Sequence, residues 1–207
     1  MGRRLPVRAW GEEHIMEIQA LLKALSAAEQ LKNNTRHSWT SAGRHESVAE
    51  HSWRLALMAY FVKDEYPELD MDKVIRMCLI HDLGEAFTGD IPAFVKTEED
   101  EERESALLSR WVESLPSPFK EEMGALYREM DALETGEAKL CKALDRMETI
   151  IQHNEAPLST WLPLEYEKNQ VYGREQCAFS PYTKELQETV KNDCLEKIRR
   201  GAGEATP

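Results

Sequence analysis

The chain has 207 residues, of which 42% are hydrophobic and 31% charged, and its formal net charge is −12 at pH 7. That length suffices for one well-buried core, and an acidic chain lacks the basic face that binding to DNA or RNA requires. No apolar run is long enough to cross a membrane, and the first residues, MGRRLPVRAW, lack the apolar segment of a secretory signal. We therefore expect a cytoplasmic protein with no nucleic acid or membrane partner.

The first half of the chain shows helical periodicity and no convincing alternating strand. Residues 12–32 carry an apolar stripe suited to packing on a bundle, formed by Ile15, Ile18, Leu21, Leu22, Leu25 and Leu31. The segment from Asn33 to Arg44 breaks this pattern and is predicted to be an ordered loop. Ser47 and Glu50 form a capping box that starts a helix running to about Glu65.

The rest of the chain also predicts helices. Asp70 caps a helix over roughly 71–87, and further helices are expected at about 98–114, 118–133, 136–154 and 182–200. The stretch 155–181 is irregular and partly helical, and residues 201–207 are expected to be disordered. The fold class that follows is an all-α helical bundle.

Charged residues interrupt the apolar pattern of the helix predicted at 71–87. His81, Asp82 and Glu85 fall on one arc of that helix, which also carries Val74, Met77 and Cys78. Two carboxylates and an imidazole therefore point toward the core, where an unpaired charge costs several kcal/mol. A divalent cation would compensate them, because carboxylate oxygen and neutral imidazole are its common ligands.

Two other helices offer similar residues. His51 shares its face with Val48, Leu55, Met58 and Val62, so it also points inward. A lone histidine on an apolar face is usually a hydrogen-bonded core residue, but two helices that each present one favour a metal. Asp145 lies at the edge of the buried side of the helix at 136–154, and periodicity alone leaves open whether it is a ligand or faces solvent.

These residues occur in a recognisable order. His51 is followed by the sequence HDLGE at residues 81–85, by TGDI at 88–91 and by Asp145, and an upstream Arg36-x-x-Trp39 precedes them. The chain resembles the HD-domain superfamily of phosphohydrolases, most closely the HD-domain 5'-deoxynucleotidases, which include the bacterial YfbR type and eukaryotic relatives. The resemblance extends from about Leu22 to Ala156. We therefore expect a single HD domain over residues 1–200, with its metal-site core at about 33–156 and a C-terminal helix at 182–200.

The resemblance implies roles for individual residues. His51, His81, Asp82 and Asp145 would ligate one divalent metal, for which this ligand set accepts manganese, cobalt, iron, zinc or copper. Glu85 and Asp90 are implicated in catalysis, and in some relatives they hold a second cation, which magnesium would suit, with the main-chain carbonyl of Ile91. Glu85 would move a proton or orient the attacking water; the alternative is a salt-bridged carboxylate outside the ligand set.

Candidate substrate contacts are less sharply defined. Arg36 is expected to clamp the phosphate, because guanidinium offers a bidentate fork, and Arg44 and Arg54 are weaker candidates. Trp39 would stack on a base or wall off the sugar, or else anchor its loop. His45 and His153 could be extra ligands, but histidines in loops and at helix ends are mostly exposed to solvent.

The implied activity is hydrolysis of (deoxy)nucleoside 5'-monophosphates by a homodimer, since family members pair. Three alternatives stay open. The first is phosphohydrolysis of a longer nucleotide, by a triphosphohydrolase or a phosphodiesterase. The second is an iron-dependent HD oxygenase, although such enzymes usually need further histidines after the HD pair, and none lies between Asp82 and Asp145. The third is a non-catalytic nucleotide-binding module, which would bind nucleotide without releasing phosphate.

Overall fold

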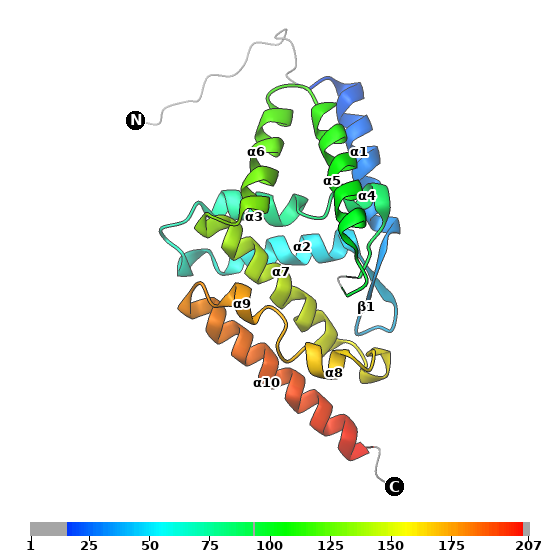
Figure 1. Ribbon diagram of the computed structural model, residues 1–207, viewed down its shortest axis with the longest axis vertical. Coiled ribbons are helices and arrows are strands. Elements are labelled where there is room, and N and C mark those ends of the chain that lie inside the picture. Colours follow the sequence, from blue (N-terminus) through cyan, green and yellow to red (C-terminus); the bar gives the residue numbers. More distant parts are fainter. Residues whose placement is uncertain (1–15, 93, 205–207) are drawn as a thin grey trace, which may run out of the picture.

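The computed structural model describes residues 16–92 and 94–204, which are mostly helical (Figure 1). The longer helices are α1 (Ile18–Asn33), α2 (Val48–Phe61), α3 (Met71–Ile80), α5 (Glu98–Glu113), α6 (Phe119–Ala132), α7 (Gly136–Glu155) and α10 (Pro181–Glu204). The shorter elements are β1 (Thr35–Trp39), β2 (His45–Ser47), η1 (Lys63–Glu65), α4 (Glu85–Thr88), η2 (Leu158–Thr160), α8 (Glu165–Lys168) and α9 (Arg174–Cys177). None of the helices in these ranges is long and apolar enough to cross a membrane.

Helix α7 runs through the middle of the molecule, with α2 and α3 on one side and α10 on the other (Figure 1). Its residues face neighbours in both directions, so more than half of the helix is buried. Leu140 and Leu144 pack with Leu55 of α2 and Met77 of α3, while Met147 packs toward α9 and α10. A helix that is buried nearly all round can hold polar side chains at fixed positions in the interior.

The helix predicted at 71–87 is divided. Helix α3 ends at Ile80, and residues 81–84 form turns in which amide groups bond three residues back, as from Leu83 to Ile80 and from Glu85 to Asp82. Two backbone carbonyl oxygens here are hydrogen-bonded to side chains: the His81 ring bonds Cys78 O, and the Tyr127 hydroxyl donates to Ile80 O. The chain therefore tightens to a 3₁₀-like path before α4, and the prediction of one continuous helix was wrong.

The segment predicted as a loop contains a small hairpin. β1 and β2 pair antiparallel, with Thr35 opposite Ser47 and Trp39 opposite His45. The expectation of a chain without strands was therefore wrong at this point, because five residues of Thr, Arg, His, Ser and Trp give no clear alternation. The hairpin lies against α7: Gln152 donates to the Trp39 carbonyl, and Arg36 reaches Thr149. It thereby brings β1 side chains to the face of α7 that carries Asp145.

The first two helices differ from their predicted form. In α1 only Leu31 is buried, and the rest of the apolar stripe is exposed, namely Ile18, Leu21, Leu22 and Leu25; Ile15 lies outside the described residues. Helix α2 starts with the predicted capping box of Ser47 and Glu50. It ends at Phe61 instead of continuing to Glu65, and the 3₁₀ turn η1 covers the last three residues of the predicted span.

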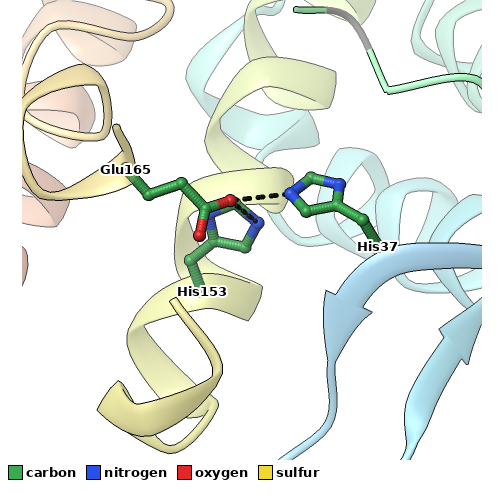
Figure 2. Close-up of side chains that lie close together, drawn as sticks. All are labelled: His37, His153 and Glu165. Carbon is green, nitrogen blue, oxygen red and sulfur yellow. Dashed lines mark hydrogen bonds and ion pairs between the residues drawn. The ribbon is translucent and has the colours of Figure 1, made fainter. Parts of the chain in front are cut away.

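The segment at 155–181 is partly helical, as predicted, through η2, α8 and α9. Helix α8 lies beside the hairpin and α7, and Figure 2 shows Glu165 of α8 turned toward His37 of β1 and His153 of α7. Helix α10 continues through Gly201 to Glu204, so the disorder predicted for residues 201–204 was wrong. A Cβ at Gly201 would lie 2.2 Å from Leu158 Cδ2, which shows how closely the helix end packs on η2.

Candidate metal centre and cavity

The four predicted metal ligands converge from three parts of the chain. His51 comes from α2, His81 and Asp82 from the turn after α3, and Asp145 from α7. His51 Nε2 lies 3.3 Å from His81 Nε2 and 3.3 Å from Asp145 Oδ1, and His81 Nε2 lies 3.0 Å from Asp82 Oδ2. The remaining separations, 3.6 Å from His51 to Asp82 and 3.7 Å from His81 to Asp145, close the group. Ligand atoms of one ion are spaced in this way.

The other nitrogen of each imidazole is already bonded. His51 Nδ1 pairs with the Glu148 carboxylate, and His81 Nδ1 bonds the Cys78 carbonyl at 2.9 Å. Metal-binding histidines usually donate their second N–H to a carboxylate or carbonyl, which fixes the ring and leaves Nε2 for the ion. Both Nε2 atoms therefore point to the same space as the two aspartates, and His51 is fully buried.

The charges of these four side chains favour the binding of a cation. Burial alone raises the pKa of Asp145, yet hydrogen bonds from His51 and His81 hold it well below its ordinary range. Burial lowers the pKa of His81, but the Asp82 and Asp145 carboxylates raise it well above the usual value. The carboxylates thus draw protons onto the imidazoles. A divalent ion would supply that positive charge through the same atoms, so the residues present fit a metal.

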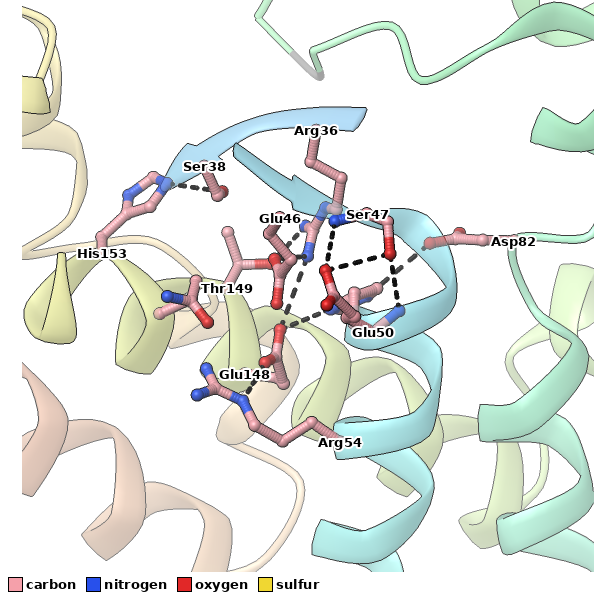
Figure 3. Close-up of polar contacts among 12 residues, drawn as sticks. Arg36, Ser38, Glu46, Ser47, Glu50, Arg54, Asp82, Glu148, Thr149 and His153 are labelled. Carbon is pink, nitrogen blue, oxygen red and sulfur yellow. Dashed lines mark hydrogen bonds and ion pairs between the residues drawn. The ribbon is translucent and has the colours of Figure 1, made fainter. Parts of the chain in front are cut away.

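Glu148 is the centre of a buried ion-pair network behind His51, and the sequence analysis did not identify this residue. Its carboxylate is 1% exposed and pairs with His51, with Arg54 Nε at 2.5 Å and with Arg36 Nη1 at 3.5 Å (Figure 3). Burial raises the pKa of Glu148, but the bond from His51 and the nearby arginines lower it overall. A signal was available: Glu148 lies four residues after Leu144, on the apolar face of α7, where an acid needs a partner.

Arg36 does not present a free guanidinium to the cavity. Its Nη1 lies 3.1 Å from Glu46 Oε2 as well as near Glu148, and its Nη2 donates to the Thr149 hydroxyl at 3.1 Å. The side chain is 11% exposed. In this arrangement Arg36 neutralises two buried carboxylates, and contact with a phosphate would compete with those bonds. Arg54 is paired with Glu148 and Glu155.

Glu85 and Asp90 line the same cavity as Asp82 and Asp145. Glu85 is 7% exposed, and its Oε2 has no hydrogen-bond partner among the described residues. Burial raises the pKa of Glu85 to about 10, helped by the Asp82 and Asp90 carboxylates. Burial also raises the pKa of Asp90. Burial and the two neighbouring carboxylates thus favour the protonated form of Glu85.

Two cavities meet at the acids. One, of about 670 Å³, is lined by Arg36, His37, Asp82, Glu85, Asp90 and Ile91, and the other, of about 890 Å³, by His81, Asp82 and residues of α5 and α6. Lys96, Lys142 and Asp145 border both. Lys142 Nζ lies 3.6 Å from Asp145 Oδ2. An anionic substrate would therefore meet cations at the cavity wall, although the chain as a whole is acidic.

The remaining candidate residues lie outside the two cavities or differ from their predicted exposure. Trp39 packs against His45, with ring centroids 4.1 Å apart and the ring planes tilted by 38°, and it lines neither of the two cavities. Arg44 pairs with Glu50 on the surface, and His45 is exposed, as expected of a loop histidine. The expectation that His153 faces solvent was wrong: it is 5% exposed, because α8 and the hairpin cover that end of α7.

The family model described as "HD domain" matches residues 28–187. The chain belongs to the HD-domain family. This HD-domain protein is 36% identical over 141 residues to human 5'-deoxynucleotidase HDDC2, covering 66% of the chain and 68% of the relative. It is 29% identical to 5'-deoxynucleotidase hdd1 of Schizosaccharomyces pombe, over 64% of the chain and 70% of that relative.

Solved structures share the same arrangement of helices. A predicted metal-dependent phosphohydrolase from Magnetospirillum magnetotacticum superposes with a TM-score of 0.71 at 29% identity, covering 89% of this chain and 94% of the other. A conserved hypothetical protein from Pyrococcus furiosus gives a TM-score of 0.64 at 29% identity, with 83% and 99% covered. The predicted family and the all-α class are confirmed.

Proposed function

We propose that this HD-domain protein hydrolyses the 5'-phosphomonoester of (deoxy)nucleoside monophosphates, with one divalent metal held by His51, His81, Asp82 and Asp145. The observation that carries the proposal is the convergence of these four side chains, of which Asp82 and Asp145 line both cavities. The similarity to proteins named 5'-deoxynucleotidase supports the substrate class. When bound, such an ion polarises a phosphoryl group and lowers the pKa of a bound water.

Other residues around the metal centre would orient its histidines and contact the phosphate. His51 is held by Glu148 and His81 by the Cys78 carbonyl, so both rings keep their orientation during turnover. Lys142, at the border of the two cavities, would contact the phosphate dianion. Arg36 would add positive charge near the phosphate while it stays paired with Glu46 and Glu148.

Glu85 is the proposed proton carrier. It is buried beside Asp82, and its raised pKa, about 10, keeps it protonated at neutral pH. A carboxylic acid in that state can donate to the leaving 5'-oxygen of the nucleoside. Asp90 and Ile91 line the same cavity, so the alternative role proposed for Glu85 is as an ionised ligand, with Asp90 and the Ile91 carbonyl, of a second cation such as magnesium; in that state Glu85 would not carry the proton.

A phosphate-release screen tests the activity. Chelated protein reloaded with manganese, cobalt, iron, zinc or copper is assayed on all common ribo- and deoxynucleoside 5'-monophosphates. Asp82→Ala should lose metal and activity together, whereas Glu85→Ala should keep the metal and lose turnover. Glu99→Gln, an exposed carboxylate on α5, serves as the matched control. Near-normal turnover by Glu85→Ala would show that its assigned role is wrong. Nucleoside triphosphates are assayed alongside, and release of triphosphate from them would favour the longer substrates instead.

We also propose that two copies pair and act in the cytoplasm without binding nucleic acid. The exposed apolar side chains along α1, Ile18, Leu21, Leu22 and Leu25, support pairing, since monomers seldom leave such a patch in water. Light scattering on the purified protein tests it. A mass of two chains is expected, and a single-chain mass at micromolar concentration would contradict it.

A further inference from the structure

A second cluster of metal-type ligands lies on the wall of the 670 Å³ cavity, away from His51 and His81. His37 comes from β1, His153 from α7 and Glu165 from α8, and Figure 2 shows the three side chains facing one another. His37 Nε2 lies 2.7 Å from Glu165 Oε1, and His153 Nε2 lies 3.7 Å from the same oxygen. We propose that these three side chains form a second binding site for a divalent transition metal, of the class that zinc represents.

His153 and Glu165 each have their remaining polar atom held in place. His153 Nδ1 bonds Asn169 Oδ1 at 3.2 Å, and Glu165 Oε2 accepts from the Leu162 amide at 2.7 Å. His153 Nε2 and Glu165 Oε1 are therefore the atoms left to face the centre of the cluster. Metal sites in proteins use the same arrangement, in which outer hydrogen bonds fix the ring and the carboxylate.

The protonation states suit a metal. Burial lowers the pKa of His153, which keeps the ring neutral, and neutral imidazole is the form that binds metal. With its proton on Nδ1 toward Asn169, His153 turns a lone pair toward the lone pairs of Glu165 Oε1. Ser38 Oγ lies 3.1 Å from that nitrogen, so binding requires His153 to exchange the hydroxyl bond for the ion.

The geometry needs only small side-chain movements. Ligand atoms on one tetrahedral zinc lie about 3.3 Å apart when each is about 2.0 Å from the ion. The separations of 2.7 Å and 3.7 Å from Glu165 Oε1 lie on either side of that value. The His37 side chain is 28% exposed and lines the cavity, which gives the ion a path inward and leaves a fourth position for water.

Metal counting separates this site from the one in the proposed function. Chelated protein is reloaded with Zn²⁺, desalted and analysed by plasma mass spectrometry. The second cation proposed at Glu85 and Asp90 is magnesium, which is not supplied here. The wild-type chain should therefore retain two ions, and His37→Gln, Glu165→Gln and Asp145→Ala should each retain one. Glu175→Gln, an exposed carboxylate lining the same cavity, should retain two. With Co²⁺, the visible absorption assigned to the second site should disappear in Glu165→Gln and persist in Asp145→Ala.

Each failure has its own signature. A wild-type ion count that His37→Gln and Glu165→Gln leave unchanged would overturn the second site. A single ion that Glu165→Gln removes and Asp145→Ala spares would keep the second site and refute the metal centre of the proposed function. If Glu165→Gln does not fold, His37→Gln decides, because that side chain lies at the edge of the cavity and its loss should leave the circular dichroism spectrum unchanged.

Discussion

Replacing Glu148 by glutamine should weaken both the fold and the metal centre. The carboxylate is buried, and it accepts charged hydrogen bonds from Arg54 at 2.5 Å and from His51, with Arg36 3.5 Å away. The amide keeps one acceptor oxygen but no charge. Breaking a buried ion pair costs ~3–5 kcal/mol. Arg36 retains Glu46 and Arg54 retains Glu155, so we expect the lower end, about 3 kcal/mol of unfolding free energy.

The effect on metal binding should be separable from the loss of stability. Substituting the outer partner of a metal-binding histidine lowers affinity by about 10–100-fold. Urea denaturation of the chelated protein measures the first effect, and calorimetric titration with Mn²⁺ or Co²⁺ measures the second. Glu155→Gln is the control: it removes the exposed partner of the same Arg54, an interaction worth ~0–1 kcal/mol. Equal stability and equal metal affinity for the two variants would refute the role given to Glu148.

Three further predictions follow from particular contacts. Gly173→Ala should lower stability by ~1–3 kcal/mol in urea denaturation, because φ is +70° there and a Cβ would lie 2.6 Å from Met147 Cε; unchanged stability would contradict this packing. The Arg44 bond holds the pKa of Glu50 at about 2, below its ordinary 4.5, so its contribution is full above pH 4.5 and is lost as the pH falls toward 2. Glu50→Gln should therefore cost about 1 kcal/mol at pH 7 and almost nothing near pH 2, as thermal melts across that range would show; an equal loss at both values would argue against the linkage. Removing the metal with a chelator should lower the melting temperature, since an ion at 100 times its Kd adds ~2.7 kcal/mol to the folded state, and an unchanged scanning-calorimetry trace would contradict a bound ion.

The positions of the metal-type residues could be predicted because burial and charge conflict locally. His51 shares an apolar helix face, and His81 and Asp82 follow a mostly apolar run. Their inward direction therefore follows from helical spacing even though α3 ends at Ile80. The turn at 81–84 keeps a nearly helical path, since His81 and Gly84 both have αR dihedrals. His81, Asp82 and Glu85 therefore keep roughly the directions deduced for a continuous helix, although the helix is interrupted.

The rest of the site depends on contacts between distant segments. Sequence spacing shows neither that α8 brings Glu165 to His37 and His153, nor that the hairpin places Arg36 over α7. His153 was expected in solvent because it is near a helix end, where only tertiary packing decides exposure. The hairpin itself was missed because each strand is short and gains its stability from packing on α7.

Anomalous diffraction from crystals grown with Mn²⁺ or Co²⁺ tests the central claim most directly. A peak is expected between His51 Nε2, His81 Nε2 and the Asp82 and Asp145 carboxylates, at about 2.0–2.3 Å from each ligand atom. Crystals of protein that is active with the same metal but show no peak among these four residues would contradict the account.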